Sequence, residues 1–357
     1  MSDSSADGVL KLKAERLSRM LEAVEGSETV FVMTHDNPDP DAIASAAALA
    51  RLLDHTAGVN TRVAFGGIVG RAENRVLIQE LGLEFVDASQ LDDARSTIVA
   101  VVDTQPRAGN NALPPGRIAS IVIDHHPLRP ETEAATYADV RPAYGASSSI
   151  IVEYLRAAEL EPDLQLATAL FYAIQTETMD LGREAIQADV EASMYLYPLA
   201  DQSAISRIRH ARVPTGYFRA VHGAIDAARQ YGPVVVVELD RLGYPDMVAE
   251  IADLFLRMEG VEWAIALGQY RDRLLLSLRT YQERAHAGQL VRAAIGDRGT
   301  AGGHGSMAGG QVSVKGSSAD DVADLRAEIM RDLLRALDVA DRSPKRLVEI
   351  REEAGTG

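Results

Sequence analysis

Two kinds of hydrophobic pattern alternate along the first 200 residues. Short runs rich in apolar and β-branched side chains read as buried strands of the parallel-sheet kind: residues 30–34, 61–65, 96–102 and 117–123. Between them lie segments of helical length, of which 42–53 is a run of Ala, Leu and Ile without Gly or Pro. The alternation predicts an α/β fold with a doubly wound, mainly parallel sheet.

The pattern of strands and helices restarts near residue 231. Strands are expected at 234–239, 261–269, 273–280 and 311–314, and helices at 245–258, 286–295 and 319–337. We therefore expect a first domain over 1–200, a helical connector over 201–230, a second, smaller α/β domain over 231–340 and a polar tail over 341–357.

Acidic and histidine side chains follow three of the predicted strands. They are His35, Asp39 and Asp41 after the first, Asp103 after the third, and Asp124, His125 and His126 after the fourth. Open α/β sheets bind ligands at the carboxyl ends of their strands, so these side chains predict a site at one sheet edge. Carboxylates this close repel one another unless a cation joins them. For the first loop alone, the alternative is that they form Asx turns and a helix N-cap at Asp41.

Composition narrows the chemistry of this site. The 357 residues are 46% hydrophobic and 25% charged and include no cysteine, so a metal would be held by His and carboxylate, which favours hard cations such as Mn or Mg. The net charge of −16 argues against stable binding of duplex nucleic acid, although a small phosphate ligand remains compatible with it. The polar, acidic N-terminus and the absence of a long apolar run predict a cytoplasmic protein that does not contact membranes.

A glycine-rich stretch stands out in the second half. Residues 299–310, GTAGGHGSMAGG, would let backbone N–H groups approach a ligand, and phosphate is the usual one. The alternative is a flexible surface loop.

Together these motifs resemble the DHH phosphoesterase superfamily, whose Asp-His-His stands here at 124–126. His35-x3-Asp39-x-Asp41 is similar to its first motif, Asp103 to its second, and residues 144–148 to the segment that usually follows the third. The fourth motif is normally Thr-Asp-Thr, but the matching stretch carries Glu177 in place of Asp, which leaves Asp180 as the alternative ligand.

The second half resembles the DHHA1 domain that partners the DHH domain. Gly302-Gly303-His304 and Ala308-Gly309-Gly310 are similar to its signature, and Arg279 matches its substrate-binding Arg. The resemblance implies a cleft between the two domains in which Arg279, Gly302, Gly303 and His304 bind substrate.

The resemblance also implies two divalent metal ions, with Mn as the first expectation and Mg or Co as alternatives. One ion would take His35, Asp39 and Asp103, and the other would take Asp41, Asp103, His125 and Glu177. Neighbouring residues of an extended segment point in opposite directions, so we expect His126 to face the phosphate or the leaving group instead. Asp124 would orient a histidine.

An architecture of one DHH and one DHHA1 domain resembles the branch that degrades nano-RNA and dephosphorylates 3′-phosphoadenosine 5′-phosphate (pAp). The implied activity is that of a 3′-5′ exoribonuclease or phosphatase on a short oligonucleotide or a small phosphorylated nucleotide, compatible with a homodimer. Cyclic-dinucleotide phosphodiesterases share the core and are one alternative. A nucleotide-binding regulatory protein with a weakened metal site is another.

Overall fold

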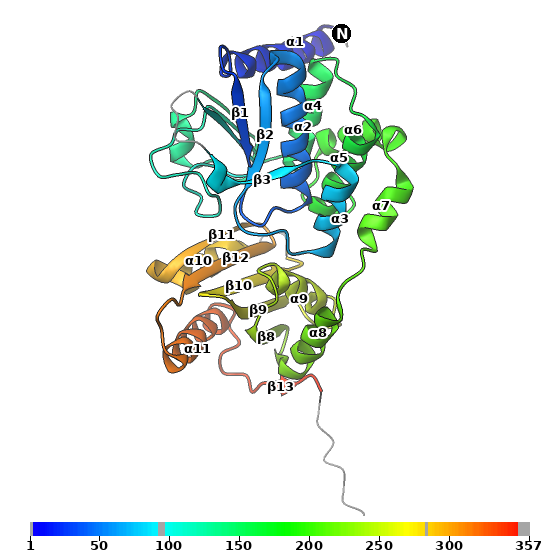
Figure 1. Ribbon diagram of the computed structural model, residues 1–357. Coiled ribbons are helices and arrows are strands. Elements are labelled where there is room, and N and C mark those ends of the chain that lie inside the picture. The colour runs from blue at the N-terminus through cyan, green and yellow to red at the C-terminus, as the bar shows by residue number, and fades with distance from the viewer. Residues whose placement is uncertain (1–2, 92–96, 283–284, 349–357) are drawn as a thin grey trace, which may run out of the picture. The chain divides into compact units, whose positions relative to one another are not determined.

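The computed structural model describes residues 3–91, 97–282 and 285–348 (Figure 1). The chain divides into two compact units, Met1–Arg212 and Val213–Gly357. Within the stretch expected to connect two domains, α7 (Gln202–Arg209) belongs to the first unit and α8 (Thr215–Ala227) to the second.

The first unit is built on a six-stranded sheet in the order β3-β2-β1-β4-β5-β6, with every pair of neighbours parallel. The strands are β1 (Thr29–Met33), β2 (Asn60–Phe65), β3 (Phe85–Asp87), β4 (Ile98–Val102), β5 (Ile121–Asp124) and β6 (Tyr137–Val140). The predicted parallel α/β sheet is confirmed. The strand order reverses between β1 and β4, so the ends of these two strands form the switch point where such sheets bind ligands.

Helices pack on the larger hydrophobic core of this unit. They are α1 (Asp3–Glu22), α2 (Pro40–Ala57), α3 (Ala72–Leu81), α4 (Ser147–Ala157), α5 (Leu164–Glu177) and α6 (Gln187–Leu196). The alanine-rich α2 is buried along most of its length, because small side chains allow α4 and α5 to approach it (Figure 1). The smaller core on the other face of the sheet, around Met33 and Val101, is covered by irregular segments.

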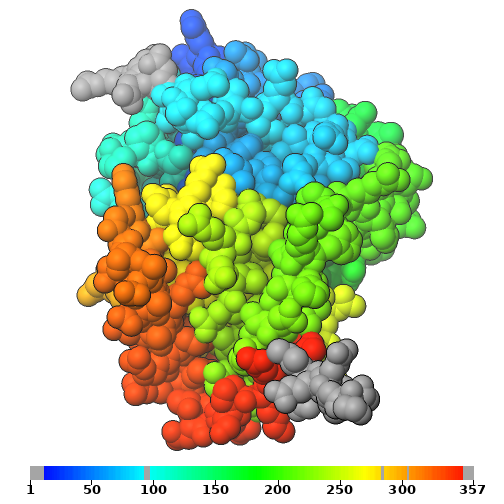
Figure 2. Space-filling view, turned by 60° about the horizontal axis from the view of Figure 1, so that its bottom comes forward, coloured from blue at the N-terminus to red at the C-terminus, as the bar shows by residue number. Residues whose placement is uncertain are grey.

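The second unit contains a seven-stranded sheet in the order β11-β12-β10-β9-β8-β7-β13, in which only β8 and β9 run parallel. The strands are β7 (Arg229–Tyr231), β8 (Val234–Arg241), β9 (Trp263–Tyr270), β10 (Arg273–Thr280), β11 (Gly299–His304), β12 (Met307–Ser313) and β13 (Lys345–Arg346). One face carries α8 and α9 (Met247–Leu256), and the other carries α10 (Ala287–Ile295) and α11 (Ala319–Ala336). The polar face of α11 forms part of the surface of this unit (Figure 2, orange to red).

Short 3₁₀ turns complete both units: η1 (Ala88–Gln90), η2 (Pro130–Ala134), η3 (Tyr197–Leu199) and η4 (Gly296–Arg298). In the described part of the chain, no helix has both the length and the apolar character needed to span a membrane.

The glycine-rich stretch is a β-hairpin, so its interpretation as a flexible loop is wrong. β11 and β12 pair antiparallel across it, from Gly299 opposite Val312 to His304 opposite Met307. Close packing explains several of the glycines, since a Cβ on Gly303 would lie 2.3 Å from the carbonyl oxygen of Met307. Sequence reasoning missed these strands because glycine has no side chain to add to a strand pattern.

We predict that Gly303→Ala destabilises the second unit. Gly303 has a φ of 141°, and an added methyl group would also meet the backbone of Ala308, so about 1–3 kcal/mol of unfolding free energy should be lost. Gly302→Ala is the control, because a Cβ there meets nothing within 4 Å. Denaturant unfolding of both variants measures the difference, and equal stabilities would contradict the packing argument.

Candidate metal centre

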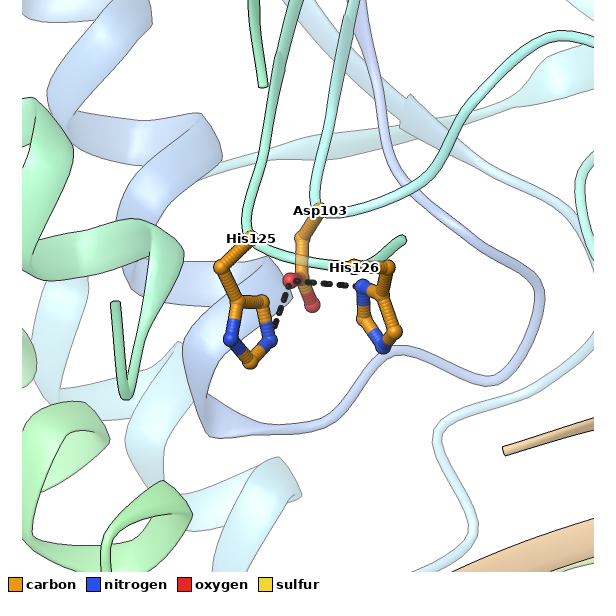
Figure 3. A group of neighbouring side chains, drawn as sticks. All are labelled: Asp103, His125 and His126. Atoms are coloured by element: carbon orange, nitrogen blue, oxygen red, sulfur yellow. Dashed lines mark ion pairs between the residues drawn. The ribbon is translucent and has the colours of Figure 1, made fainter. Parts of the chain in front are cut away.

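Asp103 lies at the centre of the acidic and histidine residues that sequence analysis singled out. It follows β4, is 2% exposed and has a φ of 58°, a left-handed conformation that a non-glycine residue adopts only where its surroundings hold it. Its Oδ2 lies 3.5 Å from His35 Nε2. Its Oδ1 lies 3.5 Å from His125 Nε2 and 3.9 Å from His126 Nδ1 (Figure 3). One carboxylate therefore faces three imidazoles.

Two groups of ligand atoms share this carboxylate. His35, Asp39 and Asp103 form one group, and Asp103, His125 and His126 form the other, with the ligand atoms of each group within 4.8 Å of one another. Such spacing can hold one cation in each group, with Asp103 bridging them. Within the described part of the chain, Asp41 and Glu177 belong to neither of these groups.

Asp39 and Asp41 each accept hydrogen bonds at a helix N-terminus. Asp39 is the N-cap of α2, where its Oδ1 accepts from the Ala42 amide at 3.0 Å, so the alternative of an N-cap at Asp41 is wrong. Asp41 instead accepts from the amides of Ser147 and Ser148 at 2.7 and 2.8 Å, at the start of α4. Capping is compatible with metal binding here, because Asp39 also directs its Oδ2 to within 3.6 Å of His35 Nε2.

Burial and mutual repulsion raise the pKa of two carboxyl groups at this site. Burial, followed by the charges of Asp103 and Glu177, raises the pKa of Asp41 well above its usual range. Burial, followed by the charges of Asp39 and Asp103, raises the pKa of Glu177 to about 8. A bound cation would relieve this repulsion. The donor atoms are imidazole nitrogens and carboxylate oxygens, a set that fits a divalent ion such as Mn.

The two candidates for the last ligand point to different surroundings. Glu177 is the last residue of α5 and is close enough to Asp39 and Asp103 for their charges to affect it. Asp180 lies within a turn in which Met179, Asp180 and Leu181 all have positive φ. Its Oδ1 accepts a hydrogen bond from Arg209 Nη2 at 2.8 Å near the surface. These placements favour Glu177.

His125 and His126 lie side by side, so the expectation that they point in opposite directions is wrong. Their ring centroids are 4.5 Å apart, and both rings face Asp103 (Figure 3). The reason is that β5 ends at Asp124 and the chain bends at the two histidines instead of remaining extended.

The Asp124 carboxylate is hydrogen-bonded to the ring of His126, two positions further along the chain. Its Oδ1 contacts His126 Nδ1 at 2.8 Å and accepts from the His125 amide at 2.9 Å. Burial alone would lower the pKa of His126, but the Asp124 carboxylate raises it to about 10. This geometry is what the expected orienting role of Asp124 requires.

Sequence reasoning missed the groups that form hydrogen bonds to the candidate ligands and so orient them. The Ser147 hydroxyl donates to Asp103 Oδ1 at 2.9 Å, and His125 Nδ1 lies 3.2 Å from the Tyr144 carbonyl oxygen, to which it donates. Both groups belong to the segment 144–148, which the sequence marked by resemblance but without a role. Hydrogen bonds across such sequence distances leave no local signal.

The expected substrate-binding residues all belong to the second unit. Strand register places Arg279 opposite Met307, and Met307 opposite His304. Arg279 Nε lies 2.9 Å from Asp253 Oδ1 on α9. Gly302 and Gly303 are exposed in β11, whereas the side chain of His304 lies outside the described residues.

Comparison with known proteins gives a family match over the part of the chain that carries the metal centre. Residues 29–174 match the DHH family, N-terminal domain. The chain is 32% identical to the uncharacterized protein MJ1633 of Methanocaldococcus jannaschii over 87% of its own length and 64% of that protein. It is 25% identical to the cyclic-di-AMP phosphodiesterase PdeA of Listeria monocytogenes over 92% of its own length and 50% of that protein.

A solved structure shares the fold. The crystal structure of an exopolyphosphatase-related protein from Bacteroides fragilis covers 92% of this chain, and this chain covers 98% of it, with a TM-score of 0.67 at 14% identity. The chain spans about half to two thirds of the length of the two curated relatives, 50% and 64%. Residues 29–174 of this chain therefore form a domain of the DHH family.

Proposed function

We propose that this protein is a metal-dependent phosphoesterase that hydrolyses a short oligonucleotide or a small phosphorylated nucleotide. The observation that carries the proposal is that two groups of His and Asp ligand atoms share the single carboxylate of Asp103. The match of residues 29–174 to the DHH family supports the same reaction class.

The side chains of the first unit would hold two divalent ions. His35 and Asp39 would serve one ion, Asp103 would bridge both, and His125 would serve the other. His126 is the third member of that second group, but we assign it to the substrate side because its Nδ1 is bonded to Asp124. Asp41 and Glu177 would complete the second site. The pKa of each is raised by burial and by neighbouring carboxylates, which supports this assignment because a cation would relieve the repulsion. When bound, such ions polarise phosphoryl oxygens and activate water. Mn is the ion that we propose, with Mg and Co as alternatives, because the ligand set lacks thiolate.

His126 and Asp124 would act on the substrate side of the site. Asp124 holds Nδ1 of His126, so the other ring nitrogen, Nε2, is the one that we assign to the phosphate or the leaving oxygen. A protonated His126 would donate a hydrogen bond there and stabilise negative charge as it develops. Asp124 would keep the ring in this orientation without contacting the substrate.

Two substrate classes are candidates. Nano-RNA and pAp come first, because the motifs of the chain resemble those of the branch that acts on these substrates. A cyclic dinucleotide comes second, because a relative is a cyclic-di-AMP phosphodiesterase.

The deciding experiment is a hydrolysis panel in the presence of Mn. Short oligoribonucleotides, oligodeoxyribonucleotides, cyclic dinucleotides and pAp are compared, and we expect short RNA or pAp to be hydrolysed fastest.

Asp103→Ala should lower kcat/KM by about 10²–10³-fold or more and weaken binding of both ions, because a bridging ligand serves two sites. Calorimetric Mn titration measures the binding. A variant that still binds two ions tightly would contradict the bridging role.

A second prediction separates Glu177 from Asp180. Glu177→Gln keeps the shape and removes the charge, so it should weaken one metal site by about tenfold or more and reduce hydrolysis. Asp180→Asn is the matched control and should change metal affinity less than twofold, because Asp180 is bonded to Arg209. The reverse result would move the ligand assignment to Asp180.

A third prediction concerns phosphate binding in the second unit. Arg279→Ala should raise KM by about 10–100-fold, the loss expected for a charged hydrogen bond, while the metal content stays the same. Arg273→Ala on the same strand is the control, since Arg273 is exposed and bonded to Gln311. Loss of metal from Arg279→Ala, or an equal rise in KM for both variants, would show that the assignment of Arg279 is wrong.

A further inference from the structure

Gln105 has a buried side-chain amide that is hydrogen-bonded to Asp124, the first residue of the Asp-His-His sequence. It lies two residues after Asp103 and is 1% exposed. Its Nε2 donates to Asp124 Oδ2 at 2.6 Å and to the Pro127 carbonyl at 3.1 Å. Its Oε1 accepts from the Arg129 amide and from the Thr132 hydroxyl, both at 2.8 Å. The side chain thus makes four hydrogen bonds, which is all that an amide can form in full.

The partners of Gln105 determine which way its amide faces. The Arg129 amide can only donate, and the Pro127 carbonyl can only accept. Rotating the amide by half a turn would place N–H against N–H and oxygen against both the carbonyl and the Asp124 carboxylate. The donor side of Gln105 therefore faces Asp124, whatever the position of the hydroxyl hydrogen of Thr132.

These bonds connect Gln105 to the site through Asp124. Asp124 is fully buried, and each of its two oxygens has a partner: Oδ2 bonds Gln105, and Oδ1 bonds His126 Nδ1 and the His125 amide. If the Gln105 donor were lost, the Asp124 carboxylate could rotate, and the ring of His126 would lose its fixed partner. The bonds to Pro127, Arg129 and Thr132 hold the loop that follows the two histidines.

We propose that Gln105 is a positioning residue of this centre: its amide fixes the Asp124 carboxylate and, through it, the direction in which His126 faces Asp103. The hydrogen-bonding positions of its side chain are all taken by protein groups, so we assign it no contact with metal or substrate. It acts as a polar support behind a carboxylate and histidine pair, and disturbing such supports typically costs 10–100-fold in metal affinity or activity. The inference about function rests on the proposed metal site, whereas the inference about His126 orientation does not.

The test compares Gln105→Glu with Thr132→Val. Gln105→Glu keeps an oxygen to accept from Arg129 and Thr132 but replaces the donor facing Asp124 by a carboxylate oxygen. Thr132→Val removes one bond from the other side of the same amide, is equally buried and leaves the donor to Asp124 in place. It is therefore the control for general loosening of the loop.

Three measurements are made on wild type and variants: crystal structures without metal, Mn binding by the loss of free-Mn EPR signal, and kcat with KM on the best substrate of the panel. For Gln105→Glu we expect a His126 ring turned away from Asp103, with Mn affinity or kcat lowered about 10–100-fold and KM little changed. Thr132→Val should keep the His126 orientation and wild-type Mn affinity, even if its melting temperature falls.

The outcomes separate this inference from the proposed function. A wild-type protein that binds no Mn would overturn the proposed function, and the metal-free crystal structures would still decide whether Gln105 holds His126. An unchanged His126 in Gln105→Glu, or equal losses in both variants, would overturn the inference about Gln105. If Gln105→Glu fails to fold, the double variant Gln105→Met with Thr132→Val replaces that pair by apolar groups while still removing the donor to Asp124, and the same results are expected.

Discussion

The structure depends on keeping several carboxylates together at one buried sheet edge. Removing a charged group from water is costly unless hydrogen bonds or opposite charges compensate for it. The helices provide part of this compensation: Asp39 caps α2, and Asp41 accepts two amide bonds at the start of α4. Each helix N-terminus also favours negative charge. A cation shared at Asp103 would supply the remainder, which is why the arrangement suits a metal centre.

The connection between Asp41 and α4 also assembles the site. Ser147 donates its amide N–H to Asp41 and its hydroxyl to Asp103, so one residue joins the first turn of α2 to the end of β4. The α4 N-cap position is Ala146, which has no side-chain acceptor. The first turn of α4 therefore depends on a carboxylate from another element, and helix and site stabilise each other.

A second polar network supports the histidines from a greater distance. Arg141, which follows β6, is bonded to Asp139, Glu153 and the hydroxyl of Tyr144. The Tyr144 carbonyl in turn accepts from His125. Paired and hydrogen-bonded in this way, buried charges need not destabilise the fold, but loss of one partner would leave another charge uncompensated. The orientation of His125 thus depends on groups that lie outside the candidate metal centre.

Local sequence patterns were enough to predict the parallel α/β sheet of the first unit and the acidic and histidine residues at the ends of its strands. Both follow from local patterns, because apolar runs specify buried strands and a parallel sheet brings the ends of its strands to one side. Tertiary structure alone decided that Asp41 caps α4, that His125 and His126 lie side by side, that the glycine-rich stretch is a hairpin and that Gln105 stands behind Asp124. The physical reason is that these features depend on hydrogen bonds and packing between distant segments, as with Asp41 and Ser148, which are 107 positions apart. A local pattern specifies what a side chain can bind, and only the folded chain decides which partner it meets.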